Sequence, residues 1–198
     1  MAAHAPEPTP GRERGSSPWE GAVLRPLTRC QVDDRLQELG DVYTHTSDGG
    51  EAARARFLRR LATAVQRPGF ALVLAGNTHP TGLAYGFPVR GEGTPGEGLG
   101  AYLPMGLFRL AAAGRLFAIP EIVVPPEVCR QYQGRDWNLA RRLQKQLLRD
   151  HGAALGVTLV CRGDTATLEA LRSWGWRCLP GGFGVHPPAS RRALVLSP

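Results

Sequence analysis

Apolar residues recur along the chain at two spacings, which predict strands and helices in turn. Continuous apolar runs rich in β-branched residues, typical of buried strands, occupy 116–124 and 156–161. Apolar stripes at helical spacing run through 51–66 and 137–148. We expect further strands at 23–26, 70–75, 81–89 and 191–196, further helices at 31–43 and 165–174, and a short helix or irregular segment at 102–113. This alternation predicts an α/β domain.

The longest apolar run is interrupted in its middle. Pro120 and Glu121 separate Leu116–Ile119 from Ile122–Val124. Proline has no N–H to give to a neighbouring strand, so we expect a β-bulge there. After a polar loop the chain enters the amphipathic helix of 137–148. A strand, a loop and a helix in this order place free N–H groups where they can hold phosphate.

Two segments carry a resemblance to a known family. Glu121–Val124 followed by Arg135–Leu143 resembles the acetyl-CoA motif of the GNAT superfamily of N-acyltransferases, Arg/Gln-x-x-Gly-x-Gly/Ala. Arg135 matches its first position and Ala140 its last, whereas Asn138 stands where glycine is usual. The segment 164–176 resembles the family's closing motif, Asn-x-x-Ala-x-x-x-Tyr-x-x-x-Gly-Phe/Trp. The resemblance covers the chain from about residue 20 to 198, with the motifs in the family's order.

The resemblance implies an α/β fold with a mixed, mostly antiparallel central sheet flanked by helices, in the order β-α-α-β-β-β-α-β-α-β-β. It also implies transfer of an acetyl group from acetyl-CoA, or of another acyl group from its CoA ester, to a primary amine of a small molecule or peptide. The amine would attack the thioester directly in a ternary complex. Glu121 is the expected general base. The alternative for Glu121 is a glutamate that faces solvent or pairs with an arginine.

The same resemblance assigns the other candidate site residues. Main-chain N–H groups at the start of the helix would hold the pyrophosphate, and one at Ile122 or Val123 would face the thioester oxygen. The cofactor-binding candidates are Ile122, Val123, Val124, Arg135, Asp136, Trp137, Asn138, Leu139, Ala140, Asp164 and Thr167. Tyr43 and Tyr85, with Glu121, are expected to line the acceptor site.

Two departures from the family pattern motivate a second hypothesis. Asn138 stands in place of glycine. Asparagine tolerates a positive φ better than most residues, but its side chain would crowd the phosphate. Leu171 stands where the family has a tyrosine that protonates the leaving thiolate, and leucine has no proton to donate. The alternative function is therefore a catalytically weak or inactive GNAT-fold module that binds acyl-CoA or a metabolite.

Charge and composition limit the other function classes. The net charge is +7, and basic side chains are not interleaved with aromatic ones, so we expect no nucleic-acid partner. The arginines at 54, 56, 59 and 60 are expected to form a solvated helix face. Four cysteines without paired spacing predict isolated buried thiols and no metal site.

The ends of the chain and its longest apolar runs complete the predictions. Residues 1–18 are rich in Pro, Gly and Ser, so we expect a disordered tail before one domain at 19–198. No apolar leader or membrane-length run occurs, which favours a cytoplasmic protein without a membrane partner. A homodimer is possible through pairing at the edge of the last strands.

Overall fold

The protein is built on a seven-stranded mixed sheet. The computed structural model describes residues 21–46, 49–76, 78–90, 99, 102–130, 137–179 and 190–198. The strands are β1 (Leu24–Leu27), β2 (Ala71–Gly76), β3 (Pro80–Pro88), β4 (Leu116–Val123), β5 (Leu155–Cys161), β6 (Arg177–Cys178) and β7 (Arg191–Leu196). Their spatial order is β1-β2-β3-β4-β5-β7-β6. Described neighbours pair antiparallel except β4 and β5, which confirms the predicted mixed sheet.

The helices follow the predicted order with additions. They are α1 (Arg29–Asp34), α2 (Leu36–Thr46), α3 (Gly50–Val65), α4 (Met105–Ala112), α5 (Pro126–Arg130), α6 (Leu139–Asp150) and α7 (Thr165–Ser173). The helix expected at 31–43 divides at Arg35, whose backbone leaves the helical region at φ −113°. The short helix α5 was not predicted, because its five residues are too few to show a helical stripe.

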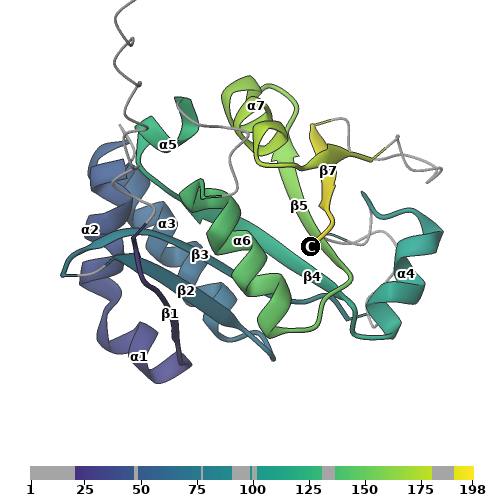
Figure 1. Cartoon of the computed structure of the whole chain (residues 1–198), viewed down its shortest axis with the longest axis horizontal. Helices are drawn as coiled ribbons and strands as arrows, with labels where there is room; N and C mark the ends of the chain where they lie inside the picture. The colour runs from purple at the N-terminus through teal and green to yellow at the C-terminus, as the bar shows by residue number, and fades with distance from the viewer. Residues whose placement is uncertain are drawn as a thin grey trace, which may run out of the picture.

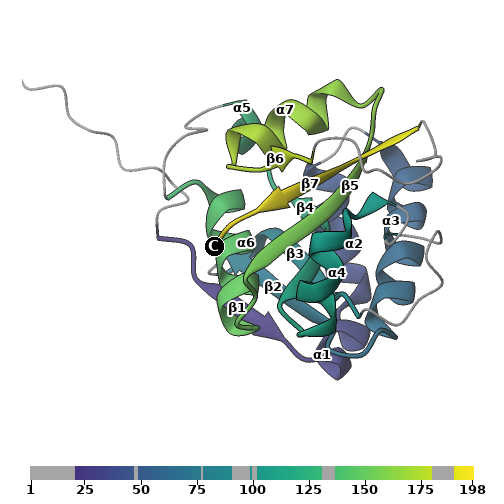
Figure 2. The same ribbon diagram turned by 90° about the vertical axis from the view of Figure 1, so that its right-hand side faces the viewer.

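Helices cover both faces of the sheet. In Figure 1, α6 crosses one face while α2 and α3 lie on the other. Figure 2 shows α4 on the same side as α2 and α3. The side chains of β4 divide between the faces by strand alternation, because Phe117 and Ile119 pack with α6 and α7 whereas Leu116 and Ala118 pack with α4.

The predicted bulge in β4 is confirmed. Phe87 pairs with Ala118 and Tyr85 with Glu121, so β3 advances two residues while β4 advances three. Gly86 lies opposite the extra residue, and a Cβ atom there would clash with the main-chain oxygen of Ala118. A side chain at position 86 would therefore push the two strands apart.

Beyond the bulge, β4 and β5 separate. Their parallel pairing runs from Leu116 with Leu155 to Ala118 with Val157 and then ends. On its other side β5 stays paired with β7 as far as Cys161, and β4 stays paired with β3 as far as Val123. An opening therefore separates β4 from β5, while each of the two strands stays paired with its other neighbour.

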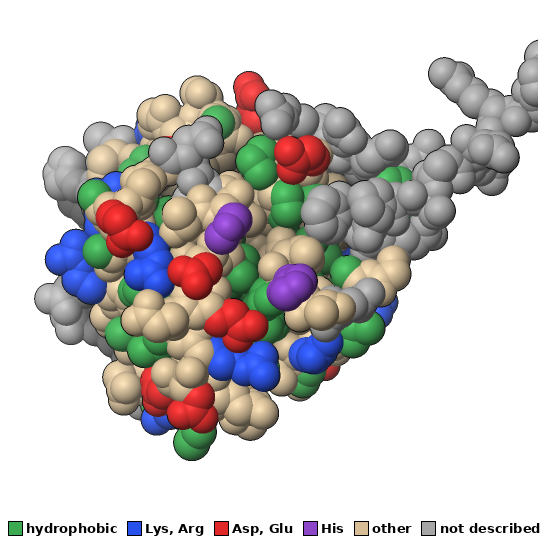
Figure 3. Space-filling view, turned by 90° about the vertical axis from the view of Figure 1, so that its left-hand side faces the viewer, with side chains coloured by type: hydrophobic (Ala, Val, Ile, Leu, Met, Phe, Trp, Pro, Cys, Tyr) green, Lys and Arg blue, Asp and Glu red, His purple; other side chains and the backbone are tan. Residues whose placement is uncertain are grey.

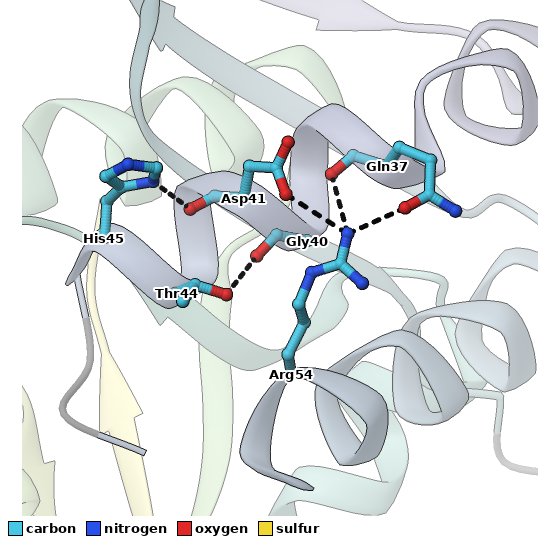
Figure 4. A network of polar contacts seen from close by, with 6 residues as sticks. All are labelled: Gln37, Gly40, Asp41, Thr44, His45 and Arg54. Carbon is cyan, nitrogen blue, oxygen red and sulfur yellow. Dashed lines mark hydrogen bonds and ion pairs between the residues drawn. The ribbon is translucent and has the colours of Figure 1, made fainter. Parts of the chain in front are cut away.

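Arg54 of α3 forms hydrogen bonds and an ion pair with residues of α2, as Figure 4 shows. Its Nη2 donates to the main-chain oxygen of Gln37 at 3.3 Å and to the side-chain oxygen at 2.8 Å. It also pairs with the Asp41 carboxylate at 3.1 Å. The guanidinium lies over Gly40, where a Cβ atom would meet it at 2.9 Å. The expectation of a solvated arginine face was therefore wrong for Arg54, whose side chain is 16% exposed.

Charged side chains of both signs are interspersed on the side of the molecule drawn in Figure 3. The excess of positive charge is thus not gathered on that face. Among the described helices, none is long and apolar enough to cross a membrane. The tail 1–18 lies outside the described residues, and its separation from one domain at 19–198 stays a prediction.

Candidate active site

A cleft of about 1320 Å³ opens where β4 and β5 separate. It has two sides, which we name after the helices that line them. The α3 side includes Tyr43, Arg60, Arg67, Phe87, Arg90, Phe108 and Glu121. The α7 side includes Ile122, Val124, Cys129, Asp164, Thr167, Leu171 and Trp174. The cleft therefore connects the two faces of the sheet through the gap in the β4–β5 pairing.

Glu121 lies on the α3 side and is held by an arginine. Nε and Nη2 of Arg60 donate to its two carboxylate oxygens at 3.0 and 2.8 Å. The hydroxyl of Tyr85 donates to Oε2 at 3.3 Å. Three of the roughly four acceptor positions of the carboxylate are thus occupied, and the side chain remains 17% exposed to the cleft. Arginine pairing, the alternative left open from the sequence, is what the structure shows.

This network shifts the pKa values of Glu121's two partners. Burial, followed by the nearby Glu121 carboxylate, raises the pKa of Tyr85 far above its ordinary range. The hydrogen bond from Arg60 to Glu121 raises the pKa of the Arg60 guanidinium. Tyr85 is therefore a neutral donor and Arg60 a permanent cation across the physiological range. The site holds a fixed charge pair beside the opening.

The two tyrosines expected to line an acceptor site lie at different depths. Tyr43 lines the cleft and stacks on Phe57 with ring centroids 4.5 Å apart. Tyr85 is 1% exposed and packs in the core between the sheet and α3. Its hydroxyl donates a hydrogen bond to Glu121, and the ring is too deeply buried to contact a ligand in the cleft.

The predicted cofactor residues of β4 and α7 do meet at the cleft. Ile122, Val123 and Val124 line it from the strand, and Asp164 and Thr167 line it from the start of α7. Asp164 caps α7 by accepting the N–H of Thr167 at 3.0 Å. Arg135 and Asp136 lie outside the described residues. Trp137 is half-buried just before α6.

Asn138 begins α6 as a helix cap. Its φ is −54°, so a positive φ does not explain this residue. Its side-chain oxygen accepts the N–H groups of Ala140 at 3.0 Å and Arg141 at 3.4 Å, and its Nδ2 donates to the main-chain oxygen of Val128 at 3.1 Å. The side chain is buried, and Leu139 and Ala140 are fully buried in the core. The N–H group of Ala140, which was expected to face pyrophosphate, is therefore already bonded within the protein, as is that of Arg141.

Helix α7 brings a buried donor to the cleft. Trp174 is 4% exposed, and its Nε1 has no hydrogen-bond partner within the part of the chain that the structure describes. The main chain of Trp174 is fixed by Gln144, which donates to its carbonyl oxygen at 2.8 Å and accepts from Nε1 of Trp176 at 2.8 Å. An acceptor on a ligand at this wall would satisfy the unpaired indole N–H. Leu171, one turn earlier, supplies an apolar surface to the same wall.

The cysteines are free, as expected, but none of the four is buried. Cys30 and Cys161 are exposed, and Cys129 and Cys178 are intermediate. Cys129 and Cys161 line the cleft. Burial alone would raise the pKa of the Cys178 thiol, but the guanidinium groups of Arg172 and Arg192 lower it. No group of metal-ligating side chains occurs among the described residues.

Solved structures share this architecture. No protein-family model matches the chain, and no curated protein matches it. An acetyltransferase from Thermus thermophilus superposes with a TM-score of 0.55 at 13% identity, covering 89% of this chain and 97% of that one. PaiA N-acetyltransferase from Thermoplasma acidophilum, solved with coenzyme A, gives 0.54 at 10% identity, covering 90% and 99%. The GNAT domain of S. lividans PAT gives 0.54 at 14% identity, covering 89% and 90%.

The chain has the GNAT fold. At these identities the likeness establishes the fold and leaves the substrate open. The fold resemblance drawn from the two motifs is thereby confirmed. The chain differs from the motif at Asn138, which caps the start of α6, and at Leu171, which lines the cleft.

The sequence did not indicate Arg60 as a site residue. It was expected on a solvated helix face, but its guanidinium reaches into the cleft and binds a carboxylate 61 positions away. A weak signal existed, because Arg60 lies next to the apolar stripe of Phe57, Leu61 and Ala64 and so near the buried face of α3. The pairing itself depends on the packing of α3 over β4.

Proposed function

We propose that this protein is an N-acyltransferase that transfers an acetyl group from acetyl-CoA to a primary amine of a small molecule or peptide. The observation that carries the proposal is the cleft between β4 and β5, which lies where the pairing of the two strands ends in a GNAT fold. Coenzyme A is bound in the solved PaiA structure that shares this fold.

The α7 side suits the amide-rich arm of a CoA ester. Main-chain groups of β4 beyond Ala118 have no partner on β5, so an extended ligand with amide groups could bond to them as a strand does. Trp174 offers an unpaired indole N–H on the same side. The pyrophosphate would lie toward the start of α6, where the positive end of the helix dipole favours an anion. An acyl-CoA would supply the activated acyl group.

Glu121 is the proposed acceptor for the proton of the attacking amine, directly or through water. The bidentate Arg60 contact and the Tyr85 hydroxyl fix its position and leave about one acceptor site facing the cleft. In the reaction the amine nitrogen forms a bond to the acyl carbon, the carbon–sulfur bond breaks, and CoA leaves as the thiolate. With Leu171 in the wall, solvent would protonate that thiolate.

Two measurements test this function in order. Isothermal titration with acetyl-CoA, with free CoA as control, tests binding, and thiol release with a panel of amines tests transfer. Glu121→Gln keeps one acceptor oxygen for Arg60 but removes the carboxylate, so kcat/KM should fall roughly 100-fold. Glu127→Gln, an exposed glutamate of α5 outside the cleft lining, should leave it unchanged. The absence of acetyl-CoA binding would refute the proposal.

A second candidate is a GNAT-fold module that binds an acyl-CoA or metabolite without efficient turnover. Three observations favour it: Asn138 occupies two helix N–H groups, Arg60 and Tyr85 occupy most of the Glu121 carboxylate, and Leu171 supplies no acid. Binding of acetyl-CoA together with no thiol release across the amine panel would select this candidate. Rapid transfer to any amine would exclude it.

A further inference from the structure

The α3 side of the cleft carries more positive than negative charge. Arg60, Arg67 and Arg90 line it, and Glu121 is the carboxylate there. Arg60 is paired with Glu121, while Arg67 and Arg90 have no ion-pair partner among the residues that the structure describes. A concave surface lined by uncompensated arginines attracts anions and raises their local concentration.

Arg67 is held in place by its surroundings. Its main chain forms the turn that ends α3, with its N–H donating to Ala64 at 2.9 Å and its oxygen accepting from Phe70 at 3.1 Å. Arg29 also donates to that oxygen at 3.3 Å. Gly69, at φ +75°, allows the turn to press against Pro88, because a Cβ atom there would come 2.8 Å from the proline ring. The turn is thus fixed against the end of β3.

The Arg67 side chain lies over an aromatic ring of the cleft. Its Cζ atom is 4.6 Å from the centroid of Phe87, within the range of a cation–π interaction. Such a contact orients the guanidinium without using its N–H donors, which stay available to an anion. A carboxylate matches this planar fork of donors, because its two oxygens can accept two parallel N–H···O bonds.

The rest of the α3 side is apolar. Leu103 is buried, and Leu99 and Phe108 pack with it against the floor of the cleft near Ala118. These residues surround the same space that Arg67 and Arg90 border. A ligand that fits both features has a negative group at one end and an apolar body beside it. Glu121 lies on the same side and offers its remaining acceptor position to an amine.

We propose that the acceptor is a small amino carboxylate with an apolar side chain, whose carboxylate binds Arg67 and Arg90. This inference rests on the proposed transferase function, since it names the substrate class of the same cleft. The amine would point toward Glu121 and the apolar body would pack on Phe87 and Phe108. The carboxylate and the amine of the acceptor would thus meet charges of opposite sign.

The test compares phenylalanine with phenylalaninamide, which differ in the carboxylate. Each is measured with the wild type, Arg67→Gln, Arg90→Gln and the control Arg56→Gln, which removes an exposed arginine of α3 outside the cleft lining. Ligand-observed NMR titration without acyl-CoA gives the dissociation constants. Thiol release with acetyl-CoA gives kcat/KM. Because both amines are measured with every variant, the ratio between variants cancels the different basicity of the two amines.

The expected result is a preference of the wild type for the carboxylate that falls about tenfold in Arg67→Gln and in Arg90→Gln, and not in Arg56→Gln. Equal binding of the two ligands, or a preference unchanged by both cleft variants, would overturn the proposal even if other amines are acetylated. If no amine is acetylated, the transferase proposal fails, and the NMR titration still decides whether Arg67 and Arg90 bind a carboxylate. Circular dichroism of each variant excludes loss of folding as the cause.

Discussion

Replacing Asn138 with alanine should lower stability and raise affinity for CoA at the same time. The Asn138 side chain caps α6 through two N–H groups and donates to the carbonyl of Val128 from a buried position. Loss of a helix cap costs about 1 kcal/mol, and a buried carbonyl left without its donor costs about 1–3 kcal/mol. We therefore expect a loss of roughly 2–4 kcal/mol in the free energy of unfolding. Affinity should rise because the N–H groups of Ala140 and Arg141 become available to the pyrophosphate.

Urea denaturation and isothermal titration measure these two effects. With a slope of roughly 2–3 kcal/mol per molar urea, the denaturation midpoint should fall by about 1 M. The dissociation constant for CoA should decrease about tenfold, because charge-assisted hydrogen bonds replace the internal cap.

Thr28→Ala is the matched control. Thr28 caps α1 outside the cleft, accepting the N–H of Gln31 at 3.4 Å. This variant should lose about 0.5–1 kcal/mol and leave CoA affinity unchanged. An Asn138→Ala protein as stable as the wild type, or one that binds CoA more weakly, would contradict the reasoning.

Three further changes test other parts of the structure. Gln144→Leu should lower the free energy of unfolding in chemical denaturation by about 2–4 kcal/mol, because it leaves the buried Trp174 carbonyl and Trp176 indole N–H without their partner. An equal loss in the control Gln146→Leu, at a half-buried position of the same helix whose side chain donates to Asp150, would contradict this. Above about pH 10 an unfolded tyrosine loses its proton while folded Tyr85 keeps it, so stability falls as pH rises, by up to about 1.4 kcal/mol per pH unit. Tyr85→Phe should fall less steeply in urea melts between pH 9 and 11, and parallel profiles would disprove the coupling. Leu171→Tyr should raise kcat roughly tenfold in thiol release, whereas Leu171→Phe, which adds the ring without the hydroxyl, should not.

The sequence predicted the strands and helices around this site better than the side-chain contacts within it. Proline in the middle of an apolar run was enough to place the bulge in β4, because a missing N–H is a local property. Asn138 was interpreted by comparison with the family motif. Asparagine immediately before a helix is itself a signal for an N-cap, and that signal predicts the role that the structure shows. The Arg60–Glu121 pair was not predictable, since it joins residues 61 positions apart through the packing of α3.

The absence of a side chain at Gly86 lets β3 lie close to β4 beside the cleft. Position 86 sits where β3 faces the extra residue of β4, with no room for a Cβ atom beside the Ala118 oxygen. Alanine there would act as a wedge, moving β4 sideways with Glu121 on it while β5 stays tied to β7. The distance between β4 and β5 would therefore change with one carbon atom at a position that does not itself line the cleft. Substrate range in this fold could be altered from that position without touching any residue that meets the ligand.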